Sequence, residues 1–287
     1  MAYPPVMHAL RFAGRLCLVL GLTLGAHSFL FAQTTAQPPA PSPSLPYDPT
    51  VGQQGKDVVW VPTSDALVET MLNMAQLKPE DTLIDLGSGD GRTVIAAAKR
   101  GATALGIEYN PDMVALSKTR AAEAGVADRA TFTAADLFTS DFTKATVITM
   151  FLLPDINLRL RPQILDLAPG TRIVSNSFTM GDWEADKTET ISDCVSWCTA
   201  LLWIVPAKVQ GTWQTPGGPL TLEQQFQQVT GSLGTTAITG GRLSGDKIEF
   251  QVGDAHYAGR VTGGTIEGTV SGGRTGTWSA TRIEPRP

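Results

Sequence analysis

Histidine and cysteine are scarce in this chain, and their scarcity limits the chemistry that it can carry. The 287 residues include three histidines, and His256 is the single one after residue 32. The three cysteines are Cys17, Cys194 and Cys198. A zinc site is not expected, because structural zinc sites combine four Cys and His ligands and no histidine or third cysteine stands near Cys194 and Cys198. A histidine base is also excluded for the region between residues 33 and 205.

An excess of positive charge is lacking too. The formal net charge is −5, from 22 Lys and Arg against 27 Asp and Glu. A protein that binds a phosphate backbone needs clustered Lys and Arg, so nucleic acid is not expected as a partner. The share of hydrophobic residues, 42%, is ordinary for a globular protein, and the length is enough for one large domain or two modest ones.

Residues 1–32 have the pattern of an export signal. Arg11 and Arg15 precede an apolar run over 16–26, and a polar stretch follows. The run is shorter than the roughly 20 residues of a spanning helix, although it extends to Phe31 if two polar residues are tolerated. A cleaved signal peptide, an uncleaved signal anchor and a buried helix therefore all stay open. Either of the first two sends the rest of the chain to the periplasm or leaves it anchored in the membrane and facing outward.

A linker and a cysteine pair agree with that placement. Residues 33–55 include the run TTAQPPAPSPSLPYDP, whose composition predicts a semi-rigid extended spacer. Cys194 and Cys198 are an even pair close in sequence, and in an oxidising compartment we predict that they form a disulfide. Two unpaired cysteines are the alternative.

Residues 56–205 alternate short apolar runs with helical patterns, which is typical of a doubly wound α/β sheet. The expected strands are 82–86, 104–108, 130–134, 146–152 and 172–178, with helices at about 93–99, 111–124 and 158–167. A further helix, capped by Thr63, Ser64 or Asp65, precedes the first strand. In such a fold the ligand lies beyond the carboxyl ends of the strands.

Residues 206–287 differ in composition from the preceding region, because 16 of the 29 glycines fall there. Strand-like runs such as KIEFQV, AHYAGRV, TIEGTV and GTWSATRI stand between the glycine pairs at 240–241, 263–264 and 272–273. They predict a small antiparallel barrel or a curled meander. Exposed Trp213, Tyr257 and Trp278 would let this domain bind a glycan, lipid or envelope component, whereas aromatic side chains that fill a barrel core are the alternative.

The run LIDLGSGDGR, residues 83–92, ends a strand in an acidic residue, turns on three glycines and enters a helix. Glycine permits strained turn conformations and lets a ligand approach the main-chain amides closely. A dinucleotide fingerprint would need Gly or Ala where Arg92 stands, since a bulky side chain there spoils the helix packing. Asp85 and Asp90 instead suit a zwitterion that carries ammonium and sulfonium charges.

Residues 83–92 resemble motif I of the class I S-adenosylmethionine (SAM)-dependent methyltransferases. LGIEYNP, residues 105–111, resembles the acidic end of that family's second strand, and the match covers roughly residues 57–180. The resemblance implies that Glu108 holds both ribose hydroxyls, which suits a carboxylate that accepts two hydrogen bonds. It also implies that Asp136 receives the adenine amine. The cofactor-binding residues expected from it are Asp85, Gly87, Ser88, Gly89, Gly91, Glu108, Tyr109, Asp136 and Leu137.

WVPT at 60–63, taken with DLGSGDGR and GIEYNP, is similar to a group of small protein-lysine methyltransferases of bacteria and mitochondria. Members of that group are often associated with membranes and modify membrane-protein partners. The similarity implies a protein as methyl acceptor, with lysine as the candidate residue, and a small-molecule acceptor stays open. Membrane association through the N-terminus follows if residues 1–32 are an uncleaved anchor.

The fourth strand departs from better-known amine methyltransferases. It ends in FLLP, residues 151–154, in place of an Asn- or Asp-Pro-Pro-Tyr run. The motif that usually binds a planar amino group is therefore missing. Positioning supplies much of the rate of methyl transfer, and Asp90 or Asp155 would accept a proton if deprotonation is needed. An exported binding protein without activity is the alternative function, because SAM is made in the cytoplasm.

Overall fold

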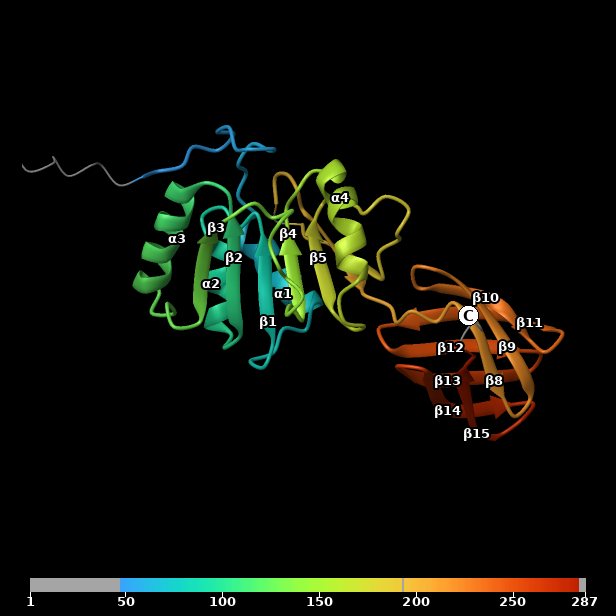
Figure 1. Cartoon of the computed structure of the whole chain (residues 1–287). Coiled ribbons are helices and arrows are strands. Elements are labelled where there is room, and N and C mark those ends of the chain that lie inside the picture. The colour runs from blue at the N-terminus through green and yellow to red at the C-terminus, as the bar shows by residue number, and fades with distance from the viewer. Residues whose placement is uncertain (1–46, 193, 284–287) are drawn as a thin grey trace, which may run out of the picture. The chain divides into compact units, whose positions relative to one another are not determined.

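The computed structural model describes residues 47–192 and 194–283 (Figure 1). The predicted export signal, Cys17 and most of the predicted linker lie outside the described residues. Within the described ranges, no helix has the length and apolar character that crossing a membrane requires.

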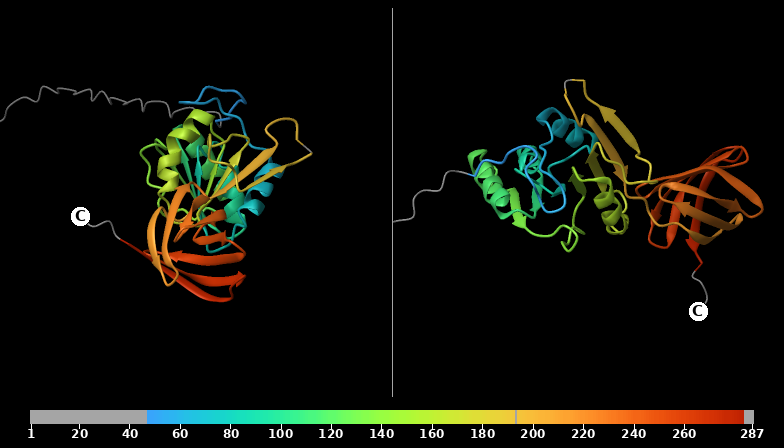
Figure 2. Two further views of the ribbon diagram at one scale, coloured as in Figure 1. Left: turned by 90° about the vertical axis from the view of Figure 1, so that its right-hand side faces the viewer. Right: turned by 90° about the horizontal axis from the view of Figure 1, so that it is seen from above.

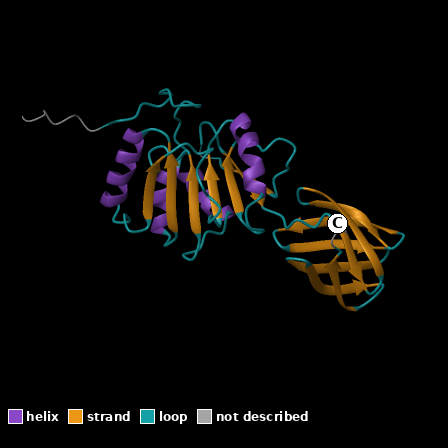
Figure 3. Cartoon of the chain, in the orientation of Figure 1, coloured by secondary structure: helices purple, strands orange, loops and turns teal. Residues whose placement is uncertain are grey.

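A sheet forms the first part, and Figure 3 shows its strands in orange with purple helices beside them. The sheet has seven strands in the order β3-β2-β1-β4-β5-β7-β6. The strands from β3 to β5 in this order pair in parallel, and β7 pairs antiparallel with both β5 and β6. The strands are β1 (Thr82–Leu86), β2 (Thr103–Glu108), β3 (Ala130–Ala134), β4 (Val147–Met150), β5 (Arg172–Asn176), β6 (Lys187–Thr190) and β7 (Thr199–Ile204). The predicted doubly wound α/β architecture is confirmed.

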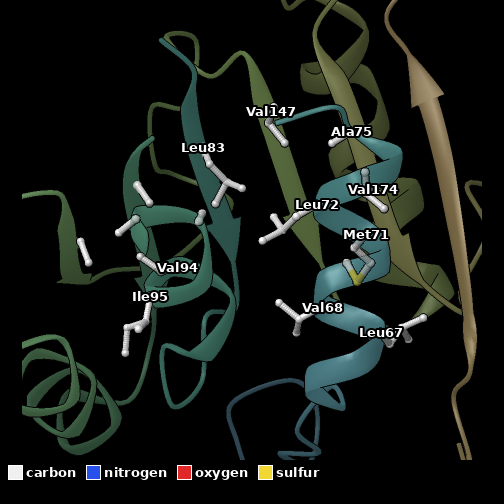
Figure 4. Close-up of a cluster of buried hydrophobic side chains, with 14 of the residues drawn as sticks. Leu67, Val68, Met71, Leu72, Ala75, Leu83, Val94, Ile95, Val147 and Val174 are labelled. Atoms are coloured by element: carbon white, nitrogen blue, oxygen red, sulfur yellow. The ribbon is translucent and has the colours of Figure 1, made fainter. Parts of the chain in front are cut away.

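Helices cover both faces of this sheet. They are α1 (Asp65–Met74), α2 (Arg92–Lys99), α3 (Pro111–Glu123) and α4 (Pro154–Leu165). The apolar sides of α1, α2 and α3 share one buried cluster with the sheet, and α4 belongs to the cluster on the opposite face. Figure 4 shows Met71 and Leu72 of α1 directed toward Val147 and Val174 on the strands. Both faces of the sheet are therefore buried, as a parallel sheet requires.

Local signals explain where the helices begin. Ser64 caps α1, since its side chain accepts a hydrogen bond from the Leu67 amide at 3.3 Å, which selects Ser64 among the three candidates. Asn110 caps α3 in the same way, and Pro111 follows at the first helical position. The helix predicted at 158–167 begins four residues earlier, at Pro154. Proline is tolerated in the first turn of a helix, because the amide that it lacks has no partner there.

Two strand predictions were too long and two strands were not anticipated. β4 ends at Met150 and β5 at Asn176, so the residues after them form loops at the carboxyl edge of the sheet. β6 and β7 were missed. β6 is exposed throughout and has no apolar alternation to mark it, and a disulfide loop stands between it and β7.

Eight strands form a closed antiparallel barrel, as the turned views in Figure 2 illustrate. Each strand pairs with the next, and β15 returns to pair with β8. The strands are β8 (Gly211–Thr215), β9 (Gly218–Gln225), β10 (Gln228–Leu233), β11 (Thr236–Ser244), β12 (Lys247–Val252), β13 (Ala255–Thr262), β14 (Thr265–Gly272) and β15 (Gly276–Arg282). The predicted barrel is confirmed, and closure leaves no unpaired edge.

Of the two alternatives for the aromatic side chains of the barrel, the one in which they fill the core is confirmed. Trp213, Tyr257 and Trp278 are 0%, 7% and 9% exposed, and Tyr257 stacks on Phe250 with ring centroids 5.0 Å apart. These rings fill the barrel interior, so they offer no outward surface to a glycan or lipid.

One predicted turn was also wrong. Gly240 and Gly241 lie inside β11, where the pairing with β12 shifts register between Thr239 and Arg242. Gly240 has φ +60°, which glycine adopts without strain. The pair is a β-bulge that bends the strand instead of ending it.

Candidate active site

A cavity of about 250 Å³ opens at the carboxyl ends of the parallel strands. Its lining residues come from an N-terminal segment (53–63), from the turns after β1, β2, β3 and β4, and from the ends that flank β5 and β7. All of them lie between Gln53 and Trp197. The cavity therefore stands where ligands bind in doubly wound folds.

The turn after β1 has no room for side chains at its glycines. Gly87, Gly89 and Gly91 have φ of +76°, +51° and +81°, a region that other residues rarely adopt. A Cβ on Gly89 would stand 2.6 Å from Nε1 of Trp60, and one on Gly91 would stand 2.8 Å from Cβ of Ser117. The glycines are therefore required both by the backbone and by the close approach of neighbours.

Glu108, at the end of β2, lies beside this turn, as its spacing from Asp85 predicts. Its Oε2 accepts a hydrogen bond from the Gly89 amide at 2.9 Å, and its Oε1 accepts one from the Asn110 amide at 2.9 Å. A carboxylate has about four acceptor positions, so two bonds from the main chain leave capacity for a diol. The two amides fix the orientation of the carboxylate and tie the first two turns of the site together.

Asp85 is buried at the end of β1 and lines the same cavity. The hydroxyl of Thr149 donates a hydrogen bond to it at 2.7 Å. Burial raises the pKa of Asp85 to about 7; the Thr149 bond opposes this rise, and the charges of Glu108 and Asp90 add to it. A cationic ligand in the cavity would favour the ionised form of Asp85.

Asp90 does not have the environment of a proton acceptor. Arg92 donates to it through Nε and Nη2 at 3.0 and 2.8 Å, and Arg120 of α3 donates at 2.5 Å. Burial acts to raise the pKa of Asp90, but the hydrogen bonds and charges of Arg92 and Arg120 outweigh burial and hold it below its ordinary value. Asp90 joins the glycine turn to α2 and α3, an environment that does not favour the proton acceptance predicted for it.

Asp155 does not line the cavity, whereas Asp90 does. Asp155 is exposed in the first turn of α4. Of the two carboxylates predicted to accept a proton, the one at the cavity is therefore the one that two arginines hold.

The residues predicted to lie on the adenine side are close together, with a partner that sequence reasoning missed. Asp136 accepts the Phe138 amide at 3.0 Å, as a cap would, and pairs with Nζ of Lys56 at 2.6 Å. The hydrogen bond from Lys56 holds the pKa of Asp136 below its ordinary value. Nζ of Lys56 also stands 4.7 Å from the ring centroid of Tyr109, which is 56% exposed. Leu137 lines the cavity beside them.

Ser88 provides an orphaned polar atom at the cavity. It is 6% exposed and lines the cavity, and its Oγ has no hydrogen-bond partner among the described residues. A buried hydroxyl without a hydrogen-bond partner is uncommon in proteins. A ligand that forms the missing hydrogen bond would explain it.

Aromatic rings line the other side of the cavity. Phe151, Phe178 and Trp197 have ring centroids 5.1 to 5.9 Å apart. Trp197 belongs to a loop closed by a disulfide between Cys194 and Cys198, so the predicted pairing is confirmed. The sequence contained the spacing of the cysteines but no signal that Trp197 would meet two phenylalanines from distant turns.

These residues fit SAM. The glycine turn lines the cavity, Glu108 has spare acceptor capacity, Ser88 lacks a partner among the described residues, and Asp85 lies buried where a positive charge would favour its ionisation. Such a combination of a glycine turn and acidic groups suits a cationic nucleoside without a pyrophosphate.

Comparisons with known proteins agree. The ANTKMT methyltransferase domain family matches residues 85–187. The protein-lysine N-methyltransferase of Saccharolobus islandicus is 35% identical over 151 residues, which cover 52% of this chain and 94% of that protein. The mouse adenine nucleotide translocase lysine N-methyltransferase is 33% identical over 129 residues, 44% of this chain and 56% of the mouse protein. A structure of an RNA methyltransferase from Salinibacter ruber with S-adenosylhomocysteine is 44% identical, covers 52% of this chain and 96% of that one, and has a TM-score of 0.49.

The fold and the cavity define a class I SAM-dependent methyltransferase, and SAM is its cofactor. Within that class, the chain belongs to the protein-lysine methyltransferase-like group. It is an enzyme, and nothing in these findings favours the alternative of a binding protein without activity.

Proposed function

We propose that this enzyme transfers the methyl group of SAM to the ε-amino group of a lysine in a protein acceptor. The observation that carries the proposal is the 35% identity to an archaeal protein-lysine N-methyltransferase across 94% of that protein's length. The mouse relative, named for a lysine of the adenine nucleotide translocase, supports the same acceptor class.

The cofactor-binding residues that we propose are those of the turn and of the β2 and β3 ends. Glu108 orients the ribose, Ser88 and the glycine turn contact the cofactor, and Asp85 provides negative charge. Tyr109, Leu137 and Asp136 lie on the adenine side, where Lys56 holds Asp136 in place.

SAM, when bound, supplies a methyl group activated by a sulfonium. The acceptor lysine must be neutral to attack it, but Asp155 does not line the cavity and two arginines hold Asp90. The residues that follow β4 provide another route: Phe151, Leu152 and Leu153 line the cavity and are apolar. Desolvation beside them lowers the pKa of a lysine, so the proton can leave to solvent before the amine reaches the methyl group.

The test uses the full-length chain with SAM labelled in its methyl group, incubated in parallel with a bacterial protein extract and with purified total RNA. After acid hydrolysis of the protein, we expect the label in methylated lysine. A Glu108→Ala variant is the control and should leave the extract unlabelled. Label in RNA, in other amino acids or in a small molecule would overturn the lysine assignment.

We also propose that the enzyme works outside the cytoplasm. The proposal is supported by Arg11, Arg15 and the apolar run over 16–26, which have the pattern of an export signal. The disulfide between Cys194 and Cys198 also supports it, because disulfides form and persist in oxidising compartments. A reporter that is active only outside the cytoplasm, fused after residue 50, should be active. A silent fusion, together with an active cytoplasmic reporter at the same position, would contradict export.

A further inference from the structure

The cavity has two chemically different halves. Its charged lining residues lie in the segment 53–63 and at the exits of β1, β2 and β3; Glu108 and Asp136 are among them. The lining residues that follow β4, follow β5 or precede β7 are all apolar, and three of them are aromatic: Phe151, Phe178 and Trp197. We call these three side chains the aromatic wall. Because β4, β5 and β7 are neighbours in the sheet, the wall stands on the half away from Glu108.

The wall has one open face. Phe151 and Phe178 are half-buried and stack at 5.9 Å, with an interplanar angle of 22°. Trp197 lies 5.1 Å from Phe178 and 5.9 Å from Phe151, tilted against both, and is 45% exposed. A large aromatic ring that is half exposed at a cavity is available to a ligand.

The disulfide loop holds Trp197 in this place. The bond between Cys194 and Cys198 closes a loop of five residues, and Trp197 has φ +59°. Ser177, next to Phe178, has φ +58°, and its amide donates to the Thr199 carbonyl at 2.7 Å. Left-handed conformations at two such residues persist only when the surroundings hold them, and they cluster at binding sites.

We propose that the Cys194–Cys198 loop is a positioning element for the methyl acceptor, and that it holds Trp197 so that the aromatic wall binds the methylated ammonium group of the acceptor. The proposal rests on the proposed lysine acceptor. An ammonium group within about 6 Å of an indole face is attracted by the negative face of the ring. With apolar residues alone lining this half, the wall is the feature that recognises a cation there. Cys194 and Cys198 act through Trp197, as positioning residues.

Opening of the loop follows simple chemistry. A dithiol such as dithiothreitol transfers two electrons and two protons to the disulfide, which becomes the thiols of Cys194 and Cys198, while the dithiol becomes a cyclic disulfide. Without the closed ring, Trp197 is no longer held in its left-handed conformation and leaves the two phenylalanines.

The first experiment measures charge recognition by the full-length protein saturated with S-adenosylhomocysteine. The probes are N-acetyl-trimethyllysine amide and its uncharged tert-butyl isostere, titrated by NMR with observation of the indole signals. We expect the charged probe to bind about tenfold more tightly. Trp197→Ala should reduce its affinity to that of the isostere, and Trp197→Phe should retain part of the preference. Equal affinity of the two probes for the wild type would overturn the proposal.

The second experiment tests the loop. We expect Cys194→Ser with Cys198→Ser, or dithiothreitol treatment of the wild type, to raise the Kd of the charged probe about tenfold and to remove the preference over the isostere. The Kd of S-adenosylhomocysteine should not change, which also shows that the variant is folded. Val195→Ala, at a fully exposed position of the same loop, is the matched control. An unchanged preference after the disulfide is removed would overturn the positioning role.

The two proposals fail in different ways. The probes report binding without methyl transfer, whereas the labelling experiment reports which atom is methylated. If the preference for the charged probe depends on Trp197 but the label is found outside lysine, only the proposed function is contradicted. If the label is found in methylated lysine but the protein does not prefer the charged probe, only the role of the aromatic wall is contradicted.

Discussion

The two halves of the cavity differ in how their residues are brought together. Most of the charged half comes from motifs that the sequence shows directly: the glycine turn after β1, and Glu108 at the end of the next strand, 19 residues after Gly89. The apolar half joins Phe151, Phe178 and Trp197 from three separate loops. A cofactor site can therefore be recognised from local motifs, whereas the side proposed for the acceptor depends on tertiary structure.

Replacement of Glu108 by Ala should have the largest effect. Loss of a carboxylate that accepts two charged hydrogen bonds costs about 2–4 kcal/mol of SAM binding, on the order of a thirtyfold to a thousandfold in Kd. The amides of Gly89 and Asn110 also lose their acceptor, so the free energy of unfolding should fall by about 1–2 kcal/mol. Calorimetric titration and urea unfolding measure the two effects. Undiminished affinity would remove Glu108 from the cofactor half.

Asp85→Asn should change the pH dependence of stability. The unfolded chain ionises Asp85 near its ordinary pKa of 3.8, whereas the folded protein keeps the proton until about pH 7. Unfolding therefore releases a proton between these values, so burial of Asp85 makes the protein less stable as pH rises from about 4 to 7, and the loss is complete above 7. The Asn variant should be more stable at pH 8, by up to about 4 kcal/mol.

The measurement for Asp85 is urea unfolding without cofactor at pH 5 and pH 8. The wild type should gain SAM affinity as pH rises through 7, because the ionised carboxylate favours a cation, and the variant should lose that dependence. Equal stability of the two proteins at pH 8 would show that Asp85 is not held protonated by burial.

Lys56→Ala should have a modest effect that is confined to the cofactor half. Its ion pair with Asp136 is exposed, and exposed pairs are weak. We expect the Kd of SAM to change about two- to fivefold, with no change in the preference for the charged acceptor probe. Lys78→Ala, which removes an exposed cation from another pair, is the control. A change in probe preference would contradict the separation of the halves.

Removal of the barrel should have the smallest effect on cofactor binding. The lining residues of the cavity all precede residue 198, so a chain that ends at about residue 206 should bind SAM within about twofold of the full chain. Fluorescence titration of a folded truncation measures this. A complete loss of binding, with the sheet intact by circular dichroism, would show that residues 207–287 complete the site.

Much of the charged half could be predicted from the sequence. The spacing of 23 residues between Asp85 and Glu108 fits one turn, one helix and one parallel strand, and parallel strands place their carboxyl ends at one edge. Lys56 could not be predicted, because the partner Asp136 stands 80 residues away. The ion pair between Asp90 and Arg120, which lies on another helix, could not be predicted either.

The barrel shows the limits of periodicity in another way. Alternation predicted most of the strands but does not say which set of alternate residues faces inward, so both an exposed and a buried position stayed open for Trp213 and Trp278, which are buried. Closure of the barrel decides that question, since the larger side chains fill the interior. Gly240 illustrates that a glycine pair indicates a bulge as readily as a turn.

The central claim is that the charged half binds SAM and the apolar half receives the acceptor. A crystal structure of the full chain with S-adenosylhomocysteine and N-acetyl-trimethyllysine amide tests it most directly. The account predicts both ribose hydroxyls within hydrogen-bond distance of Glu108 and the trimethylammonium group against the open face of Trp197. A nucleoside placed against Phe151, Phe178 and Trp197, with Glu108 bonded only to the Gly89 and Asn110 amides, would contradict it.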